Sequence, residues 1–230
     1  MSALHTRPAS RILGLFATAL TGLLLQACST PVAVEDGSDA LPAPFEGPAT
    51  SDGIRTAVLA GGCFWSVEAV FEHLRGVEEV VTGYSGGTAE QAQYELVINH
   101  RTEHAEVVRI TFDPDTISYA ELLQVFFSIV HDPTEVDRQG PDVGAAYRSH
   151  IYYVGQAQQD ISAAYLDQLE ASAVFADPIA TRVDPLSSFY QAELEHQDYV
   201  ANNPDKPYVV LYSLPKLAKL EALFPDLYVP

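Results

Sequence analysis

Cys63 is the residue of this sequence best placed to act as a nucleophile. It follows Gly61 and Gly62 and precedes Phe64 and Trp65, where an apolar run meets an amphipathic pattern. The thiolate is the reactive form of cysteine, and the N-terminus of a helix lowers the pKa of a nearby thiol. We therefore predict that Cys63 is a reactive thiol with a lowered pKa. The alternative is an inert buried cysteine, the usual fate of a lone cysteine.

A carboxyl group that could donate a proton lies at the start of a predicted strand. Glu106 has the same parity as Val108, Ile110 and Phe112, so a strand that includes it places it on their apolar face. Burial raises the pKa of a carboxyl group and makes it a candidate general acid. If the strand instead starts after Glu106, its side chain is solvated. The pattern favours neither alternative.

Aromatic residues could form the wall of a site around Cys63. Phe64 and Trp65 are consecutive, and two large rings cannot both face the core from one helix, so at least one should line a pocket. Tyr94, Tyr147 and Asp142 are weaker candidates by spacing alone. The chain has 12 tyrosines, and most tyrosines are core or rim residues.

The histidines do not predict a metal site. His100 and His104 are four residues apart, but they straddle a predicted turn and do not share a helix face. His104 or His131 could instead pair with Cys63, as in a cysteine hydrolase or acyltransferase. Spacing does not exclude that arrangement.

Strands and helices that alternate along the chain must position these residues. Period-two alternation and short apolar runs predict strands, and apolar residues at i, i+3, i+4 and i+7 predict helices. The predicted strands are 56–60, 77–84, 94–98, 106–112 and 151–154, and the predicted helices are 65–76, 118–130 and 156–173. The polar segment 131–148 predicts a functional loop. This order indicates an α+β fold with helices packed on a mostly antiparallel sheet.

The N-terminal residues predict export. Arg7 and Arg11 precede the uncharged apolar stretch 12–25, which is typical of a signal peptide over residues 1–27. Cys28 follows directly and resembles the lipidated cysteine of a bacterial lipoprotein; the alternative is an ordinary leader with a chance cysteine. Residues 28–53, rich in proline and acidic residues, predict a disordered linker. Residues 54–230 suit one folded domain.

The charge of the chain excludes some partners. The net charge is −19, and loss of Arg7 and Arg11 with the leader leaves 10 basic against 31 acidic residues, or −21. Such a charge argues against nucleic acid or anionic lipid headgroups as partners. With only two cysteines, the chain has no disulfide framework.

Five ordered motifs carry a resemblance to a known family. They are Gly61–Trp65, Gly83–Gly87, His104–Val108, His131–Thr134 and Asp142–Arg148. Over about residues 56–200 the chain resembles peptide methionine sulfoxide reductase A. The resemblance implies a ferredoxin-like α+β core and reduction of methionine S-sulfoxide, free and in proteins, by the domain 54–230.

The resemblance also implies roles for the site residues. Cys63 matches the nucleophile, which becomes a sulfenic acid, and Phe64 and Trp65 match the residues that hold the substrate methyl group. Glu106 matches the acid near the sulfoxide oxygen. The other matched residues are Tyr94 and Tyr147, whose hydroxyls bond that oxygen, and Asp142, a carboxylate that supports the site. No metal or organic cofactor is implied.

The chain departs from the family pattern at several positions. Ser66 and Glu103 stand where glycine is usual, and Pro141 stands where asparagine is common. Many relatives carry a resolving cysteine, but Ile98 occupies one of its positions and no cysteine follows Cys63. We therefore expect an external thiol, from a thioredoxin-like protein or a small molecule, to reduce the sulfenic acid.

The resemblance of Cys28 to the lipidated cysteine of a bacterial lipoprotein implies where in the cell the protein lies. We expect a monomer anchored by Cys28 in the cell envelope, on the outer membrane if the cell has two, where it repairs oxidised proteins. A non-catalytic envelope lipoprotein on the same scaffold is the remaining alternative. The motifs keep every expected polar group, which argues against it.

Overall fold

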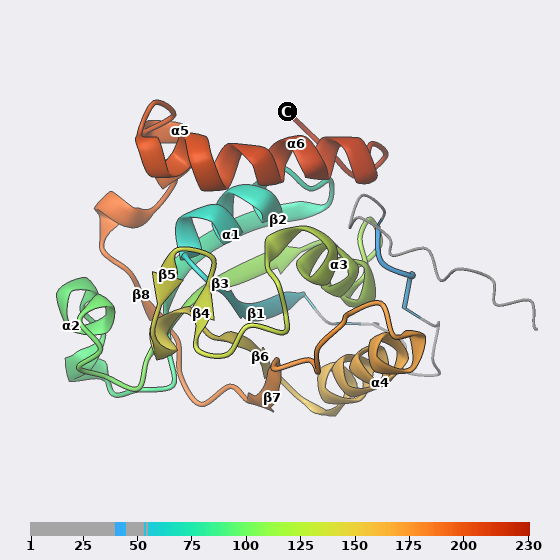
Figure 1. Cartoon of the computed structure of the whole chain (residues 1–230), viewed down its shortest axis with the longest axis horizontal. Coiled ribbons are helices and arrows are strands. Elements are labelled where there is room, and N and C mark those ends of the chain that lie inside the picture. Colours follow the sequence, from blue (N-terminus) through green and yellow to red (C-terminus); the bar gives the residue numbers. More distant parts are fainter. Residues whose placement is uncertain (1–39, 45–52, 54) are drawn as a thin grey trace, which may run out of the picture. The chain divides into compact units, whose positions relative to one another are not determined.

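A six-stranded sheet forms the centre of the part of the chain that the computed structural model describes, residues 40–44, 53 and 55–230 (Figure 1). Its strand order is β7-β6-β1-β3-β2-β8, and every pair is antiparallel except β6–β7. The strands are β1 Thr56–Gly61, β2 Val77–Ser85, β3 Ala105–Phe112, β6 Ser149–Tyr153, β7 Arg182–Pro185 and β8 Tyr190–Gln191. The strands β4 Arg138–Gln139 and β5 Asp142–Val143 form a separate small hairpin.

Six α-helices accompany the sheet in the described part of the chain. They are α1 Phe64–Glu72, α2 Tyr94–Ile98, α3 Tyr119–Val125, α4 Gln156–Ser172, α5 Tyr199–Asn202 and α6 Leu214–Leu223. Two π-helical segments, Phe126–Val130 and Val209–Ser213, extend α3 and precede α6. Short 3₁₀ turns cover Ala89–Gln91, Ala145–Tyr147 and Leu194–His196. The mostly antiparallel sheet with packed helices confirms the predicted α+β class.

The central four strands have the topology of a ferredoxin-like core. Along the chain the elements run β1-α1-β2-β3-α3-β6, and in the sheet the order is β6-β1-β3-β2. This is the β-α-β-β-α-β arrangement, in which each helix connects two parallel strands across the sheet. As a result, the C-terminal ends of β1 and β2 and the N-terminal ends of β3 and β6 meet at one end of the sheet.

The sheet is buried on both faces. In β1, Leu59 packs in the large core with the helices, while Val58 lies in a second cluster with Phe189 from the segment before β8. In β3, Val108 belongs to the helix side and Val107 to the other side. The period-two alternation therefore separates two apolar layers and does not separate core from solvent.

Helix α3 begins at the predicted capping box. The Ser118 hydroxyl accepts a hydrogen bond from the Glu121 N–H at 3.1 Å, and the Glu121 carboxylate accepts one from the Ser118 N–H at 2.8 Å. These two bonds satisfy backbone groups that a helix start leaves unpaired. The predicted helix is correct at this end, although its second half is π-helical.

The prediction of a strand over 94–98 was wrong, because these residues form helix α2. The N–H groups of Leu96 and Val97 both donate to the carbonyl of Gln93, and Val97 is the buried residue of the turn. Burial of one side chain and local hydrogen bonds outweigh the strand preference of the β-branched residues, since that preference depends on context.

Part of the predicted linker is docked on the domain. The N–H of Leu41 donates to the Ser128 hydroxyl at 3.0 Å, and its carbonyl accepts from the Gln124 amide at 2.7 Å. The Tyr165 hydroxyl donates to the carbonyl of Pro42 at 2.9 Å. The prediction of disorder over 28–53 is therefore wrong for residues 40–44. The predicted signal peptide and Cys28 lie outside the described residues.

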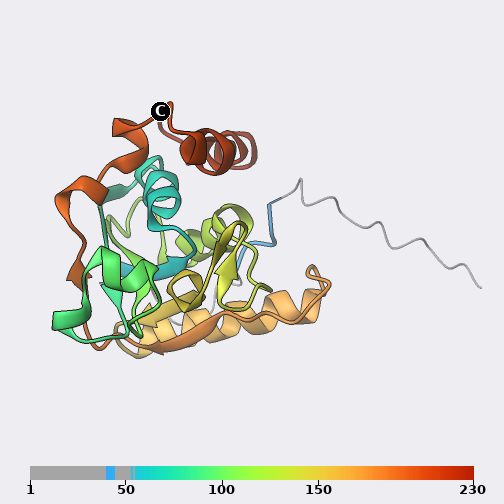
Figure 2. The ribbon, with the colours of Figure 1, turned by 60° about the vertical axis from the view of Figure 1, so that its left-hand side comes forward.

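The C-terminal segment lies against helix α1. Figure 2 shows α5 and α6 beside α1, and residues of both helices contact it. A buried hydrogen bond of 2.7 Å joins the hydroxyl of Ser66, in α1, to that of Ser213. The serine that replaces the usual glycine at position 66 thus has a partner in the segment that follows Tyr208.

Candidate active site

Cys63 lies between strand β1 and helix α1 as the N-cap residue of that helix. Its side chain is only 8% exposed. Gly62 precedes it with φ of +94°, and a side chain at Gly62 would clash with Gln139, whose Cβ lies 2.7 Å from the expected Cβ position. A glycine is therefore required here both by backbone conformation and by the close approach of the β4–β5 hairpin.

The expectation of a lowered Cys63 pKa was wrong. Burial raises the pKa of the Cys63 thiol, and the nearby carboxylates of Glu106 and Asp142 raise it further. A hydrogen bond from the Tyr208 hydroxyl opposes this effect and lowers the pKa. Removal of the thiolate from water outweighs the helix N-terminus, so the resting residue is a neutral thiol.

Glu106 lies within strand β3 and is 2% exposed, which decides between the two alternatives for its position. Its Oε2 accepts a hydrogen bond of 2.9 Å from the backbone N–H of Phe64, the residue after the nucleophile. Burial raises the pKa of Glu106 to about 8, although the bond from Phe64 opposes this shift. The carboxyl group is therefore protonated near neutral pH and can donate a proton.

Phe64 and Trp65, both predicted to hold the substrate methyl group, differ in burial. Phe64 is fully buried, and Trp65 is half-buried. The ring of Trp65 stacks on Tyr199, with centroids 3.8 Å apart and planes inclined by 10°. Its indole N–H donates to Nδ1 of His196 at 3.3 Å. These contacts fix Trp65 as one rigid aromatic wall beside Cys63.

Tyr94 reaches the site from helix α2 instead of from a strand. Its ring stacks on Phe64 with a centroid distance of 6.4 Å and lies 4.0 Å from the ring of His196. Burial raises the pKa of the Tyr94 hydroxyl, and the charges of Glu106 and Cys63 raise it further. Tyr94 is therefore a neutral hydroxyl close to both reacting groups.

Tyr147 and Asp142 come from the segment 131–148, which was predicted to be functional. Burial raises the pKa of Tyr147, and so do the charges of Glu106, Asp142 and Cys63. The Asp142 carboxylate accepts a hydrogen bond of 2.6 Å from the Tyr208 hydroxyl. The structure thus brings all seven predicted site residues in the described part of the chain to one place, at the end of the sheet where β1 and β3 meet.

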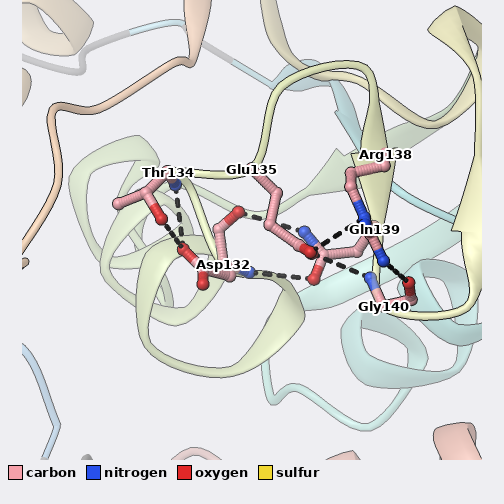
Figure 3. A network of polar contacts seen from close by, with 6 residues as sticks. All are labelled: Asp132, Thr134, Glu135, Arg138, Gln139 and Gly140. Carbon is pink, nitrogen blue, oxygen red and sulfur yellow. Dashed lines mark hydrogen bonds and ion pairs between the residues drawn. The ribbon is translucent and has the colours of Figure 1, made fainter.

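A network of hydrogen bonds joins residues 132–140 of the segment 131–148 to one another (Figure 3). The side-chain amide of Gln139 bonds both the N–H and the carbonyl of Asp132, at 3.1 and 3.0 Å. The Asp132 carboxylate accepts two bonds from Thr134, and Glu135 pairs with Arg138 at 3.1 Å. These contacts hold the β4–β5 hairpin against Gly62 and so position Asp142.

Tyr208, Lys216 and Glu193 complete the site but were not predicted from sequence. Tyr208 bonds Asp142, as described above, and Lys216 is close enough for the charges of Cys63 and Asp142 to act on its pKa. Glu193 accepts bonds from the Tyr84 hydroxyl at 2.8 Å and the Tyr94 N–H at 2.9 Å. All three lie far along the chain from Cys63, and no local pattern marks them.

The histidines do not support a cysteine–histidine pair. His104 donates from Nε2 to the carbonyl of Thr88 and accepts at Nδ1 from the N–H of Gly87. His131 donates from Nδ1 to the carbonyl of Phe126 and bonds the Ser149 hydroxyl through Nε2 at 2.6 Å. Both nitrogens of each ring are occupied by other groups, so neither ring is placed to take a proton from Cys63.

Two further properties concern the described residues only. Among them, no cluster of three or more histidine, cysteine or acidic side chains has the geometry of a metal site. None of their helices is long and apolar enough to span a membrane.

A buried thiol beside a neutral carboxyl acid and several hydroxyl groups is typical of an enzyme with a cysteine nucleophile.

Comparisons with known proteins identify the family. The family model for peptide methionine sulfoxide reductase matches residues 55–226. The chain is 48% identical over 176 residues to peptide methionine sulfoxide reductase MsrA 2 of Mesorhizobium japonicum. The aligned region covers 76% of this chain and 90% of that protein. It is 50% identical over 177 residues to MsrA 2 of Synechocystis sp., with 77% and 83% covered.

Solved structures agree. Reduced Mxr1 from Saccharomyces cerevisiae is 28% identical with a TM-score of 0.60, covering 72% of this chain and 92% of that one. Methionine sulfoxide reductase A of Corynebacterium diphtheriae is 32% identical with a TM-score of 0.56, covering 73% and 84%. The chain belongs to the peptide methionine sulfoxide reductase family.

Proposed function

We propose that this chain is a peptide-methionine (S)-S-oxide reductase that uses Cys63 as its nucleophile and Glu106 as its acid. One observation carries this assignment. The buried, protonated carboxyl of Glu106 is held by the backbone N–H of Phe64, next to the buried thiol of Cys63. A sulfoxide becomes electrophilic at sulfur when its oxygen is protonated, so thiol and acid must lie together.

The surrounding side chains suit the two ends of the sulfoxide group. The partly exposed ring of Trp65 provides an apolar surface for the methyl group on sulfur, and the buried ring of Phe64 supports it from the core. The neutral hydroxyls of Tyr94 and Tyr147 can donate hydrogen bonds to the oxygen, where negative charge develops before the proton arrives. Asp142, bonded to Tyr208, holds that hydroxyl next to Cys63.

The chemical step is balanced within the site. Glu106 gives its proton to the sulfoxide oxygen, and the sulfur of Cys63 attacks the sulfoxide sulfur as its own proton passes to the Glu106 carboxylate. The hydroxyl group then moves to the Cys63 sulfur, and the bonds from the substrate sulfur to this oxygen and to Cys63 break. The products are Cys63 sulfenic acid and methionine. The substrate sulfur is reduced by two electrons, Cys63 is oxidised by two, and Glu106 ends protonated as it began.

Turnover requires thiols from outside the chain. Cys63 is the only free cysteine among the described residues, and Ile98 is half-buried in helix α2. A first external thiol attacks the sulfenic acid and releases water, and a second thiol displaces Cys63 from the mixed disulfide. A thioredoxin-like protein or a small thiol fits this requirement.

The cellular setting forms part of the proposal. The leader 1–27 and Cys28 would anchor the chain by lipid in the cell envelope, on the outer membrane where there are two, to repair oxidised proteins there. We expect the anchored protein to be a monomer. Replacement Cys28→Ser should move the protein out of the membrane fraction, and retention there would reject the anchor.

One assay tests the reaction. The purified chain should release methionine from methionine S-sulfoxide in the presence of dithiothreitol, and Cys63→Ser should abolish this. Without dithiothreitol, dimedone should label Cys63 only after sulfoxide is added, because dimedone traps sulfenic acids. Unchanged activity in Cys63→Ser, or labelling that does not depend on sulfoxide, would reject the mechanism.

A further inference from the structure

A cavity of about 540 Å³ lies beside the two glycines that precede the nucleophile. Its lining comes mainly from the π-helical segment Phe126–Val130, the segment 131–134, the segment after α4, and helix α6. Gln139 and His131 line it and also approach the two glycines before the nucleophile. The expected Cβ position of Gly62 lies 2.7 Å from Gln139, and that of Gly61 lies 3.5 Å from the His131 ring.

Two lysines line this cavity in a strongly acidic protein. The chain has three lysines, all within residues 206–219, against 31 acidic residues. Lys216 and Lys219 line the cavity, and Lys206 is exposed elsewhere. Among the described residues, no carboxylate lies within 4 Å of either cavity lysine. Two half-buried cations without an ion-pair partner are costly unless a ligand supplies the anion.

The acidic side chains of the cavity do not supply that anion. Asp132 and Asp177 also line it, but both are exposed. The Asp132 carboxylate is bonded by the N–H and the hydroxyl of Thr134, at 2.9 and 2.6 Å. The positive groups on α6 thus remain available for a carboxylate that enters from solvent.

Lys216 links the cavity to the chemistry. It lines the cavity, and burial lowers the pKa of its ammonium group, while the nearby Cys63 and Asp142 oppose this shift. An anion bound beside it therefore lies one side chain away from the nucleophile. In a polypeptide, the residues that flank an oxidised methionine lie next to it along the chain. When the methionine sulfoxide is at Cys63, a flanking residue can therefore reach Lys216.

We propose that the cavity is a substrate subsite, in which Lys216 and Lys219 bind a carboxylate next to the methionine sulfoxide. This inference rests on the proposed reductase function. The carboxylate has two sources, an acidic side chain that flanks the oxidised methionine in a polypeptide, or the α-carboxylate of free methionine sulfoxide. We assign the flanking side chain, since the cavity extends beyond the space that one amino acid fills.

Matched peptides test this assignment in the full chain. Two pentapeptides with blocked ends carry a central methionine S-sulfoxide between two glutamates or between two glutamines. At 0.15 M salt, where charges separated by more than about 8 Å are largely screened, kcat/KM should be about fivefold higher for the glutamate peptide. The difference should lie mainly in KM, because the lysines bind substrate and do not react.

Variants separate local contact from overall charge. In Lys216→Gln/Lys219→Gln the ratio of the two kcat/KM values should fall to about one. The control Lys206→Gln/Arg75→Gln changes the net charge equally at exposed positions and should keep the wild-type ratio. Lys219→Gln alone gives a partial loss and leaves the surroundings of Cys63 intact, so the test stands even if the double variant fails to fold.

Each of the following outcomes would contradict one part of the proposal. A ratio that is the same in wild type and in both lysine variants rejects the subsite. An equal decrease of kcat/KM for both peptides in Lys216→Gln would show that Lys216 acts on Cys63 and does not bind the substrate carboxylate. A drop confined to N-acetylmethionine sulfoxide, relative to its amide, would move the carboxylate to the free amino acid. No reduction of either peptide by wild type would instead reject the reductase function.

Discussion

The Oε2 atom of Glu106 lies 2.9 Å from the backbone nitrogen of Phe64. This bond ties the acid to the residue that directly follows the nucleophile. Because Oε2 faces an N–H donor, the proton of the neutral carboxyl group resides on Oε1. A fixed acid with one defined proton position needs no rearrangement when the sulfoxide enters, which is the basis of electrostatic preorganisation.

Replacement Glu106→Gln should lower kcat by about 10² to 10⁴, the range of general acid catalysis. The pKa of Glu106 in the free protein is raised to about 8, so wild-type kcat/KM should fall as pH rises above about 8 and the carboxyl loses its proton. The residual activity of Glu106→Gln should lack this decline. A pH–rate profile of both proteins measures it, and identical profiles would shift the acid role to the tyrosines.

Replacement Tyr208→Phe should lower activity by about tenfold, because it removes a hydrogen bond to a carboxylate and the bond that favours the Cys63 thiolate. Alkylation of Cys63 by iodoacetamide should also slow at a fixed pH, since the thiolate fraction decreases. Tyr212→Phe is the matched control, because its ring neighbours Tyr208 at 5.0 Å but is partly exposed. Equal effects of the two variants would contradict this role.

Replacement Ser213→Ala should reduce the free energy of unfolding by about 1–3 kcal/mol, because it leaves the buried hydroxyl of Ser66 without its partner. The double variant Ser66→Ala/Ser213→Ala removes both hydroxyls and should recover part of that loss. Urea unfolding of the two variants gives the comparison. A double variant less stable than Ser213→Ala would contradict the pairing.

Replacement Glu68→Gln should stabilise the protein at alkaline pH. Glu68 is 1% exposed, its Oε1 has no hydrogen-bond partner among the residues that the structure describes, and burial raises its pKa to about 8 from an ordinary value of 4.5. The folded state therefore holds a proton that the unfolded state loses, so the stability of wild type declines as pH rises from about 4.5 to about 8.

Glu68→Gln should show a smaller decline than the wild type, since Glu72 and Glu106 still contribute theirs, and should exceed the wild type by about 1 kcal/mol or more at pH 8. Unfolding measured at pH 5 and pH 8 makes the comparison, with the exposed Glu79→Gln as control. A variant with the same pH dependence as wild type would show that Glu68 is charged in the folded state.

Several features followed from local pattern. The glycines before Cys63, the parity of Glu106 with Val108, and the capping box at Ser118 depend on residues close in sequence. Backbone geometry and side-chain periodicity are properties of short segments, so they can be predicted without knowledge of the fold. The α+β class followed from the same periodicities.

Other features depended on residues that only folding brings together. The sign of the Cys63 pKa shift follows from burial and from Glu106, Asp142 and Tyr208, which lie 43 to 145 residues away. Tyr94 was predicted on a strand and reaches the site from a helix because of its tertiary packing. Sequence alone thus determined which groups could react. The tertiary structure decided their protonation and their partners, because desolvation and Coulomb interactions depend on distances in space and not along the chain.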